Sequence, residues 1–228
     1  MARALFGVRA KAALVGALIT VSLGAYTWWQ YGATQREMAL LRTAIQNLKS
    51  TYPLARIVVV DQTTVSGDQT KTRVRVVFVN EEGQRRGAPI ETTLDGSMVY
   101  FEALLMIFHD PLVEKGERKT LAFPTRLFTE EVPPIKGEEL DVLDEQGVPV
   151  VYEQPEDKLE GVTAETYRQI LRRFWYYANH PEEADRYGIK VLQGQAVFTN
   201  YQLKRFYTIS VEADGGLLIS PEDFWLEE

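Results

Sequence analysis

The hydrophobic residues of this chain first form one long uninterrupted run. Residues 12–29 are 18 residues without a charge, and the uncharged stretch continues to Gln35. At a rise of about 1.5 Å per residue, some 20 apolar residues cross a hydrocarbon core of roughly 30 Å as a helix. The pattern therefore predicts a single transmembrane anchor at residues 12–31, which would tie the rest of the chain to a membrane.

The two flanks of this run differ in chemistry. Arg3, Arg9 and Lys11 precede it without any acid, in a basic tail of residues 1–11. Aromatic residues gather at the other end, where rings favour the headgroup layer of a membrane. These predicted membrane-interface residues are Tyr26, Trp28, Trp29 and Tyr31. Because basic residues favour the cytoplasmic side, we expect a cytoplasmic N-terminus and an extracytoplasmic main domain.

Two alternatives compete with an uncleaved anchor. A cleaved signal peptide has the same basic start and apolar middle, and Ser22-Leu23-Gly24 is a tolerable small-x-small site. A buried core helix is the other alternative, although this length and the position at the N-terminus disfavour it.

Small residues recur every four positions in the predicted anchor, at Ala12, Gly16, Thr20 and Gly24. This spacing places them on one helix face, where a second transmembrane helix can approach closely. Gly16, Thr20 and Gly24 are therefore candidates for helix association, although small residues are common in membrane helices and the pattern also arises by chance.

Residues 34–50 follow with an amphipathic pattern that predicts a short stalk helix. Met38, Leu41, Ile45 and Leu48 are spaced three, four and three residues apart, and Pro53 ends the pattern. Leu41, Ile45 and Leu48 are either a short dimer seam that continues the anchor or a face that packs on the chain's own domain.

From residue 56 the pattern shortens to that of strands, which indicates a β-rich domain over residues 56–228. Residues 61–71 are polar and are predicted to be a loop, and Gly83 and Gly96 are predicted in hairpin turns. Pro124 implies an edge or a bulge in its strand. The predicted strands are 57–60, 72–80, 90–94, 97–108, 119–129, 139–143, 148–152, 189–198, 205–213 and 217–219.

A helical pair is predicted at about residues 163–187. Apolar residues recur at helical spacing after Thr163, which is a suitable N-cap. Asn179 is predicted to cap a second, short helix that begins at Pro181, and Gly188 to end it. Short turns between consecutive strands imply antiparallel pairing, so the expected fold class is α+β, with a possible subdivision near residues 154–162.

Composition narrows the classes of function. The net charge is -7, and it falls to about -10 once the basic N-terminal segment is set aside, which disfavours nucleic acid as a partner. The chain has no cysteine, which excludes thiolate catalysis and zinc-thiolate sites.

No motif in the chain predicts a catalytic, metal or cofactor site. His109 and His180 lack an evident triad arrangement, and the acidic stretch at residues 130–145 lacks the ligand pattern of a calcium loop. Glycines occur in turns without a following Lys-Ser/Thr helix, so no phosphate-binding loop and no cofactor are predicted.

Trp175, Tyr176 and Tyr177 form the densest aromatic run beyond the anchor. Successive helical residues point about 100° apart, so all three cannot face one sheet. We expect at least one near the surface, and Trp175 and Tyr176 are the candidate partner surface. The alternative is a helix between two layers that buries most of these rings.

The combined pattern favours a membrane-anchored interaction or scaffold protein of the cell envelope, without catalysis. Its expected partners are the membrane, through residues 12–31, and a protein partner or further copies of the chain. The alternative is a membrane-anchored hydrolase that uses carboxylates to act on an envelope substrate.

Overall fold

The structure is a computed structural model that describes residues 2–46, 51–66, 69–109, 119–140, 143, 148, 152, 163–212 and 215–226. Within the first helix, side chains are described at residues 19–43 and at Ile45. The chain divides into two compact units, Met1–Leu41 and Arg42–Glu228.

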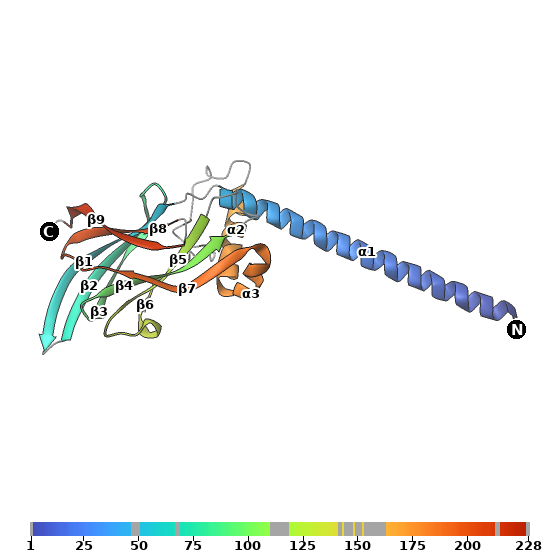
Figure 1. The fold of residues 1–228 in the computed structure, drawn as a ribbon, viewed down its shortest axis with the longest axis horizontal. Coiled ribbons are helices and arrows are strands. Elements are labelled where there is room, and N and C mark those ends of the chain that lie inside the picture. The colour runs from blue at the N-terminus through green and yellow to red at the C-terminus, as the bar shows by residue number, and fades with distance from the viewer. Residues whose placement is uncertain are drawn as a thin grey trace. The chain divides into compact units, whose positions relative to one another are not determined.

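The first unit lies within one continuous helix, α1 (Ala2–Gln46), which Figure 1 draws from blue to light blue. Its sequence contains no proline, so no residue interrupts the backbone hydrogen bonds of the helix. The predicted anchor, and the predicted stalk as far as Gln46, therefore belong to a single helix, whose residues from Arg42 onward belong to the second unit.

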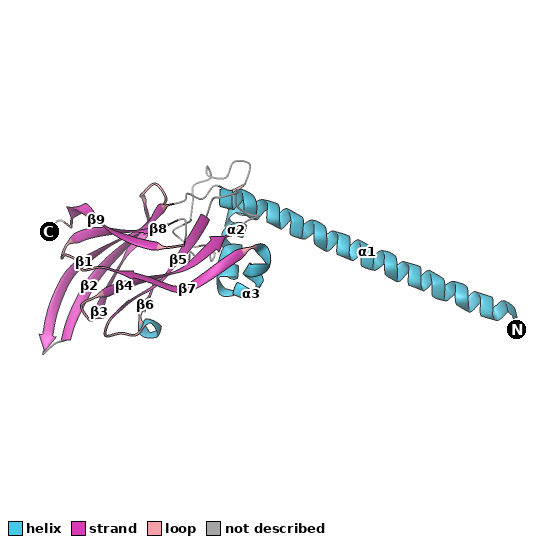
Figure 2. Ribbon diagram, viewed as in Figure 1, coloured by secondary structure: helices cyan, strands magenta, loops and turns pink. Residues whose placement is uncertain are grey.

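The second unit contains two antiparallel sheets (Figure 2). Sheet A has the strand order β3-β2-β1-β8-β9, and sheet B has the order β6-β5-β4-β7. The strands of sheet A are β1 (Tyr52–Ser66), β2 (Gln69–Val79), β3 (Arg85–Asp95), β8 (Arg205–Val211) and β9 (Leu217–Trp225). Those of sheet B are β4 (Val99–Phe108), β5 (Lys119–Thr129), β6 (Glu138–Glu139) and β7 (Ile189–Phe198).

The helices of this unit are α2 (Ala164–Asn179) and α3 (Pro181–Ala184), with short 3-10 turns η1 (Pro134–Lys136) and η3 (Asp185–Tyr187). α2 and α3 lie at one end of the sheets in Figure 1. The α+β class and the mainly antiparallel domain are thus confirmed.

The hydrophobic core lies between the two sheets. Inward-facing residues alternate along the strands of sheet A, where Ile57, Val59 and Ile209 are at most 1% exposed. Phe101, Ala103 and Leu105 of β4 are fully buried on the facing side of sheet B. The β8–β9 turn also contacts β4, because a Cβ atom on Gly215 would overlap the side chain of Ile107.

Both faces of β4 are buried from Ala103 to Phe108, and the neighbouring strand β5 is buried in the same way from Thr120 to Phe123. The additional cover comes from α2, since Phe174 packs on Phe108 with ring centroids 5.3 Å apart. This explains why residues 97–108 show a continuous apolar run rather than alternation, and the strand predicted there is confirmed.

The loop predicted at residues 61–71 is wrong. β1 continues to Ser66 and β2 begins at Gln69, and the two strands pair Thr63 with Lys71 and Thr64 with Thr70. β-branched threonines favour extended backbone, and side chains such as Thr63 and Thr64 are exposed. A hairpin whose side chains face solvent needs no apolar face. The polar composition of this hairpin therefore resembles that of a loop, and this is why the prediction failed.

Most predicted turns and caps are confirmed. Gly83, Gly96 and Gly188 have φ angles of 76°, 117° and 71°, a conformation that favours glycine. The Thr163 hydroxyl accepts a hydrogen bond from the Thr166 N–H at 3.2 Å, as expected of an N-cap. Pro124 lies at a register shift between β4 and β5, where a bulge was expected.

The cap predicted at Asn179 is wrong. α2 continues through Asn179, whose side-chain amide donates to the Trp175 carbonyl at 2.8 Å, and His180 precedes α3 instead. The hairpin predicted at residues 139–152 lies mostly outside the described residues, as does the possible subdivision at 154–162.

Candidate functional site

The four predicted membrane-interface residues lie on α1 with exposed side chains. Tyr26, Trp28, Trp29 and Tyr31 are 57%, 82%, 69% and 67% exposed. The Gln30 amide donates to the Tyr26 hydroxyl at 2.8 Å, which links two successive turns of the helix. This segment of the first unit thus presents large aromatic rings to its surroundings.

Within the part of the chain that is described, no helix is both long enough and apolar enough to span a membrane.

The helix-association residues that the structure describes are either exposed, as Thr20 and Gly24 are, or buried, as Leu41 and Ile45 are. Gly24 has open space around it, since a Cβ atom built there meets nothing within 4 Å, and Thr20 is exposed one turn before it. The surroundings of Gly16 and Leu48 lie outside the described side chains. Leu41 and Ile45 are 1% and 0% exposed. The burial of Ile45 favours the alternative in which this face packs within its own chain.

Trp175 and Tyr176 do not share one surface, because successive helical residues diverge by about 100°. Trp175 is half-buried, with its ring edge-on to Phe123 at 5.5 Å, whereas Tyr176 is 41% exposed. Tyr177 is buried at 2%. The expectation that at least one of the three rings lies near the surface is confirmed by Tyr176. Trp175 and Tyr176 do not form one joint surface, because they border different hollows.

Trp175 lines a cleft of about 460 Å³ at the junction of α2 with sheet B. Its described lining is formed by Pro124, Thr125, Arg126, Glu139, Leu140, Leu143, Trp175 and Asn179. The polar groups near the Arg126 side of the cleft are engaged with one another. An Arg126 amino group donates to the Pro134 carbonyl at 2.7 Å, and Arg126 Nε lies 3.7 Å from Glu102 Oε1. Thr125 also donates to Glu102.

Tyr176 lines a second, shallower hollow of about 310 Å³ together with Gln169, Arg172 and Arg173. Its hydroxyl donates to Glu183 at 3.1 Å, and its ring stacks on His180 at 4.1 Å. The hydrogen bond to Glu183 is the main cause that raises the pKa of the Tyr176 hydroxyl, and loss of hydration and the negative charges of Glu183 and Glu182 act in the same direction. The Tyr176 side chain is therefore held by Glu183 at its hydroxyl and by His180 at its ring face. Its hydroxyl remains protonated at physiological pH.

A third feature is a row of three aromatic rings on the outer face of sheet B. Tyr100 of β4 stacks on Phe128 of β5 with centroids 4.9 Å apart and planes 5° apart, and lies 4.6 Å from Phe198 of β7. Phe128 is 9% exposed and Phe198 is 48% exposed. We call Phe128, Tyr100 and Phe198 the aromatic row.

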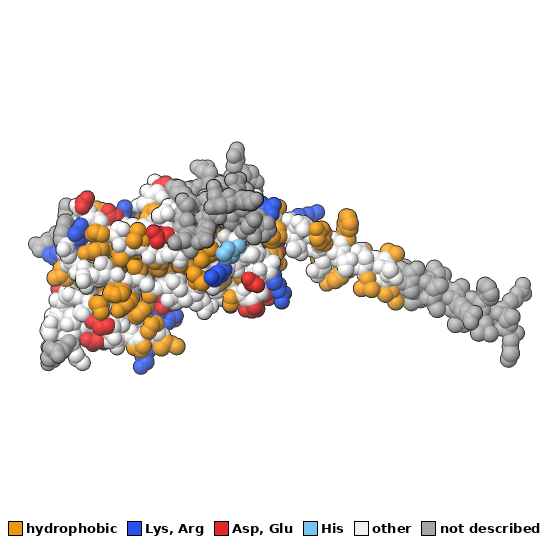
Figure 3. All heavy atoms as spheres, in the orientation of Figure 1, with side chains coloured by type: hydrophobic (Ala, Val, Ile, Leu, Met, Phe, Trp, Pro, Cys, Tyr) orange, Lys and Arg blue, Asp and Glu red, His pale blue; other side chains and the backbone are white. Residues whose placement is uncertain are grey.

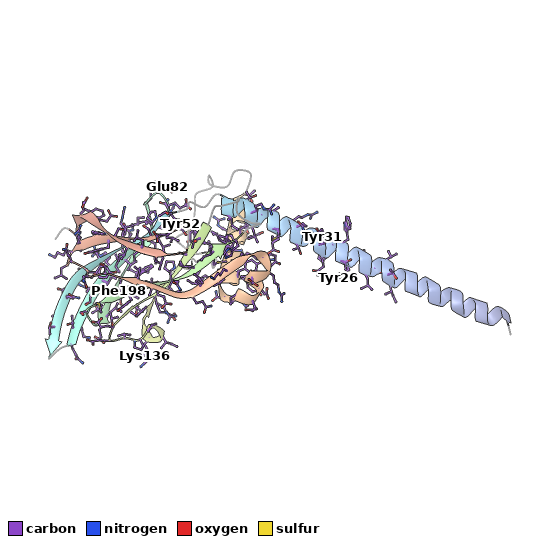
Figure 4. All side chains as sticks on the ribbon, in the orientation of Figure 1. Tyr26, Tyr31, Tyr52, Glu82, Lys136 and Phe198 are labelled. Atoms are coloured by element: carbon purple, nitrogen blue, oxygen red, sulfur yellow. The ribbon has the colours of Figure 1, made fainter. Side chains whose placement is uncertain are left out.

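The aromatic row occupies the half of this face that α2 does not cover. Strand register brings its members together, since Tyr100 pairs directly with Phe128 and with Phe198. Figure 3 shows hydrophobic side chains gathered over the strands of this unit, and Figure 4 labels Phe198 among them. Sequence reasoning missed the row because its residues are distant in the chain and the strand order was unknown.

The two histidines form no catalytic arrangement among the described residues. The backbone N–H of His109 donates to the Gly188 carbonyl at 2.9 Å at the end of β4. His180 lies between α2 and α3, with Nδ1 2.8 Å from the Tyr176 carbonyl. Where side chains are described, no three His, Asp or Glu residues gather as metal ligands would.

Comparison with protein-family models gives no match for this chain, and comparisons with curated proteins and with solved structures give none either.

Proposed function

We propose that this chain is a membrane-anchored, non-catalytic interaction protein of the cell envelope, whose second unit binds a protein partner outside the cytoplasm. The anchor is residues 12–31, with Arg3, Arg9 and Lys11 on the cytoplasmic side. Support comes from the uncharged run within an uninterrupted helix and from the exposed rings of Tyr26 and Trp28.

The observation that carries the interaction role is the aromatic row. Interfaces are enriched in aromatic side chains that combine a large apolar area with little conformational entropy. Tyr100 is already held in place by stacking on Phe128, so its side chain loses little conformational entropy when a partner covers it. Phe198, at 48% exposed, offers most of the area still open to contact.

No specific observation favours the hydrolase alternative. In the cleft beside Trp175, Glu139 is the one carboxylate in the described lining, whereas a glycosidase needs two facing carboxylates. The nearby Glu102 accepts hydrogen bonds from Thr125 and lies against Arg126.

The interaction role is tested by photo-crosslinking in intact membranes. A photoreactive phenylalanine at position 198 should capture a partner, and Phe198→Asp should abolish co-purification of that partner. A matched control is Phe224, which is 42% exposed on sheet A and packs on Phe206 at 5.0 Å. Capture from position 224 but not from position 198 would refute the aromatic row as the binding surface.

The topology is tested with external protease on permeabilised envelopes. The second unit should be digested while the N-terminal tail stays protected. A mature chain beginning near Ala25 would instead show a cleaved signal peptide.

Helix association within the membrane is a further part of this proposal. A Cβ atom built on Gly24 meets nothing within 4 Å, so Gly24→Leu should act mainly on contacts with a second helix. Reduced association in membranes, without a change in unfolding temperature, is the expected result. If neither Gly16→Leu nor Gly24→Leu changes association, the anchor only attaches the chain to the membrane and does not contribute to helix pairing.

A further inference from the structure

The described exposed charges of α2 are three arginines, Arg168, Arg172 and Arg173, and one acid, Glu165, so this helix face is mainly basic although the unit that carries it is acidic. From Arg42 onward the chain holds 21 basic and 31 acidic residues. Arg168 and Arg172 are both exposed on α2, and neither has a carboxylate partner among the described residues. Exposed arginines on an acidic domain create a local field that attracts an anionic surface.

This face is also hollowed and partly aromatic. Gln169, Arg172, Arg173 and Tyr176 line the hollow of about 310 Å³. Arg173 lies over the ring of Tyr177, 6.0 Å from its centroid. Glu183 accepts a hydrogen bond from the Tyr176 hydroxyl and keeps its negative charge there, so the positive charge of the hollow comes from Arg172 and Arg173. The hollow therefore combines positive charge with a fixed aromatic wall.

The same unit carries a protrusion of the opposite character at residues 131–138, which we call the η1 protrusion. At its centre Ile135 is 85% exposed, the highest value among the large hydrophobic side chains described. Glu131 and Glu138 flank it as acids that are not buried, and Lys136 is the one base within it. Lys136 marks its place at the lower margin of the sheets in Figure 4.

The η1 protrusion is held in one shape by its own backbone. Lys136 and Gly137 donate to the carbonyls of Pro133 and Pro134 at 2.8 and 3.0 Å, and Arg126 binds the Pro134 carbonyl. A side chain at Gly137 would lie 2.5 Å from the Leu127 carbonyl, so glycine is required for this close approach. A preformed protrusion loses little entropy when it is buried by a partner.

We propose that the hollow on α2 binds the η1 protrusion of a second copy of this chain. Ile135 would contact the Tyr176 ring, while Glu131 and Glu138 would face the arginines of the hollow. The two surfaces differ, so the contact is heterologous and joins copies head to tail into a ring or an open row. This inference rests on the proposed interaction function and identifies a second copy of the chain as one of its partners.

The contact is small compared with stable interfaces, which bury at least about 1,000 Å². Copies anchored in one membrane meet at high effective concentration, and this favours a contact that would be weak in dilute solution. The expected behaviour is therefore self-association that weakens as salt is added, because salt screens exposed charges.

The absence of cysteine from the chain permits a direct test with the full-length protein reconstituted in liposomes. Two single-cysteine variants, Ile135→Cys and Gln169→Cys, are mixed and treated with a short bismaleimide. A crosslinked pair of copies should form between positions 135 and 169. Arg186→Cys is the control, since position 186 is exposed on η3 outside the hollow. If charge complementarity sets the orientation of the contact, Arg186→Cys should give at least about tenfold less crosslinked product with Ile135→Cys.

Charge exchange distinguishes this contact from random collisions between copies in the same membrane. Arg172→Glu and Glu131→Arg should each reduce self-association about tenfold, and a mixture of the two variants should recover it. Equal crosslinking at positions 169 and 186, or no recovery in the mixture, would overturn the inference. If position 198 still captures a partner in that case, the proposed function stands and only self-recognition fails.

Discussion

The two halves of the outer face of sheet B share strands β4 and β5 but differ in what covers them. Near Phe108, α2 lies on the sheet and the side chains of β4 are buried on both faces. Near Tyr100 the same strand has one face open, where the aromatic row and the Arg126–Glu102 pair lie. One half therefore contributes mainly to stability, while the other retains surface for a partner.

The polar contacts of the two halves differ in the same way. In the covered half, tyrosine hydroxyls are buried against the β5 backbone at Thr120 and Ala122. In the open half, the Glu130 carboxylate is bound by Ser97 and Met98 at the entry to β4. Buried hydrogen bonds contribute more to stability than solvated ones, so equal substitutions should have unequal effects in the two halves.

The largest effect is expected for Phe174→Ala in the covered half. Phe174 is 2% exposed and packs on Phe108, so truncation leaves a cavity between α2 and β4. We expect a loss of about 3–5 kcal/mol in the free energy of unfolding. Denaturant unfolding of the full chain in detergent, followed by aromatic circular dichroism, measures it. A loss below about 1 kcal/mol would show that α2 is not part of the cooperative core.

A smaller effect is expected for Tyr52→Phe, which removes only a hydroxyl. That hydroxyl donates to the Thr120 carbonyl at 3.1 Å and lies 3.0 Å from the Tyr152 hydroxyl. Its loss leaves buried polar groups with fewer partners and should cost about 1–3 kcal/mol. Tyr176→Phe is the matched control on the surface and should cost less than about 0.5 kcal/mol. Equal effects would contradict the burial of the Tyr52 hydroxyl.

A pH-dependent effect is expected at Glu130 in the open half. Burial opposes ionisation, but hydrogen bonds from the Ser97 hydroxyl and from the N–H groups of Ser97 and Met98 outweigh it and lower the pKa of Glu130. A lowered pKa stabilises the fold above the ordinary value of 4.5, and this contribution is lost as the pH falls below it.

Glu130→Gln should therefore reduce stability at pH 7 by about 1 kcal/mol, since these bonds are partly solvated. The difference between the variant and the original protein should shrink as the pH falls from about 5 to about 3, the range in which the carboxylate takes up its proton. Unfolding midpoints measured across that range provide the test, and a difference that grows on acidification would contradict the assignment.

The smallest effect on stability is expected for Phe198→Ala in the open half. Its ring is 48% exposed and contacts Tyr100 on one side, so the loss should be below about 1 kcal/mol. Partner capture should nevertheless fall sharply. A large loss of stability together with retained capture would reverse the roles assigned to the two halves.

The sequence predicted local structure well where it depends on neighbouring residues. The strand at residues 97–108, the helix after Thr163 and the turn at Gly96 depend on local pattern and backbone preference. The polar β1–β2 hairpin was missed because threonine-rich strands with solvated side chains lack the apolar alternation that identifies a strand.

The candidate site was only partly accessible from sequence. Helical geometry predicted that Trp175, Tyr176 and Tyr177 could not all face one sheet, but it did not predict that Trp175 and Tyr176 would lie on different surfaces. The aromatic row required the register of three strands, in which Tyr100 pairs with Phe128 and Phe198. That register depends on long-range pairing, which no local pattern encodes.

The hydroxyl groups of Tyr52 and Tyr152 have a consequence for aggregation. An open strand edge can pair with the same strand of another molecule and seed a growing β-structure. On sheet A, the outer strands β3 and β9 contain Pro89 and Pro221, which cannot donate to such pairing. On β5, the two hydroxyls engage the backbone at Thr120 and Ala122 instead. These two phenolic oxygens thus occupy backbone groups of β5 that a strand of another molecule would need for pairing.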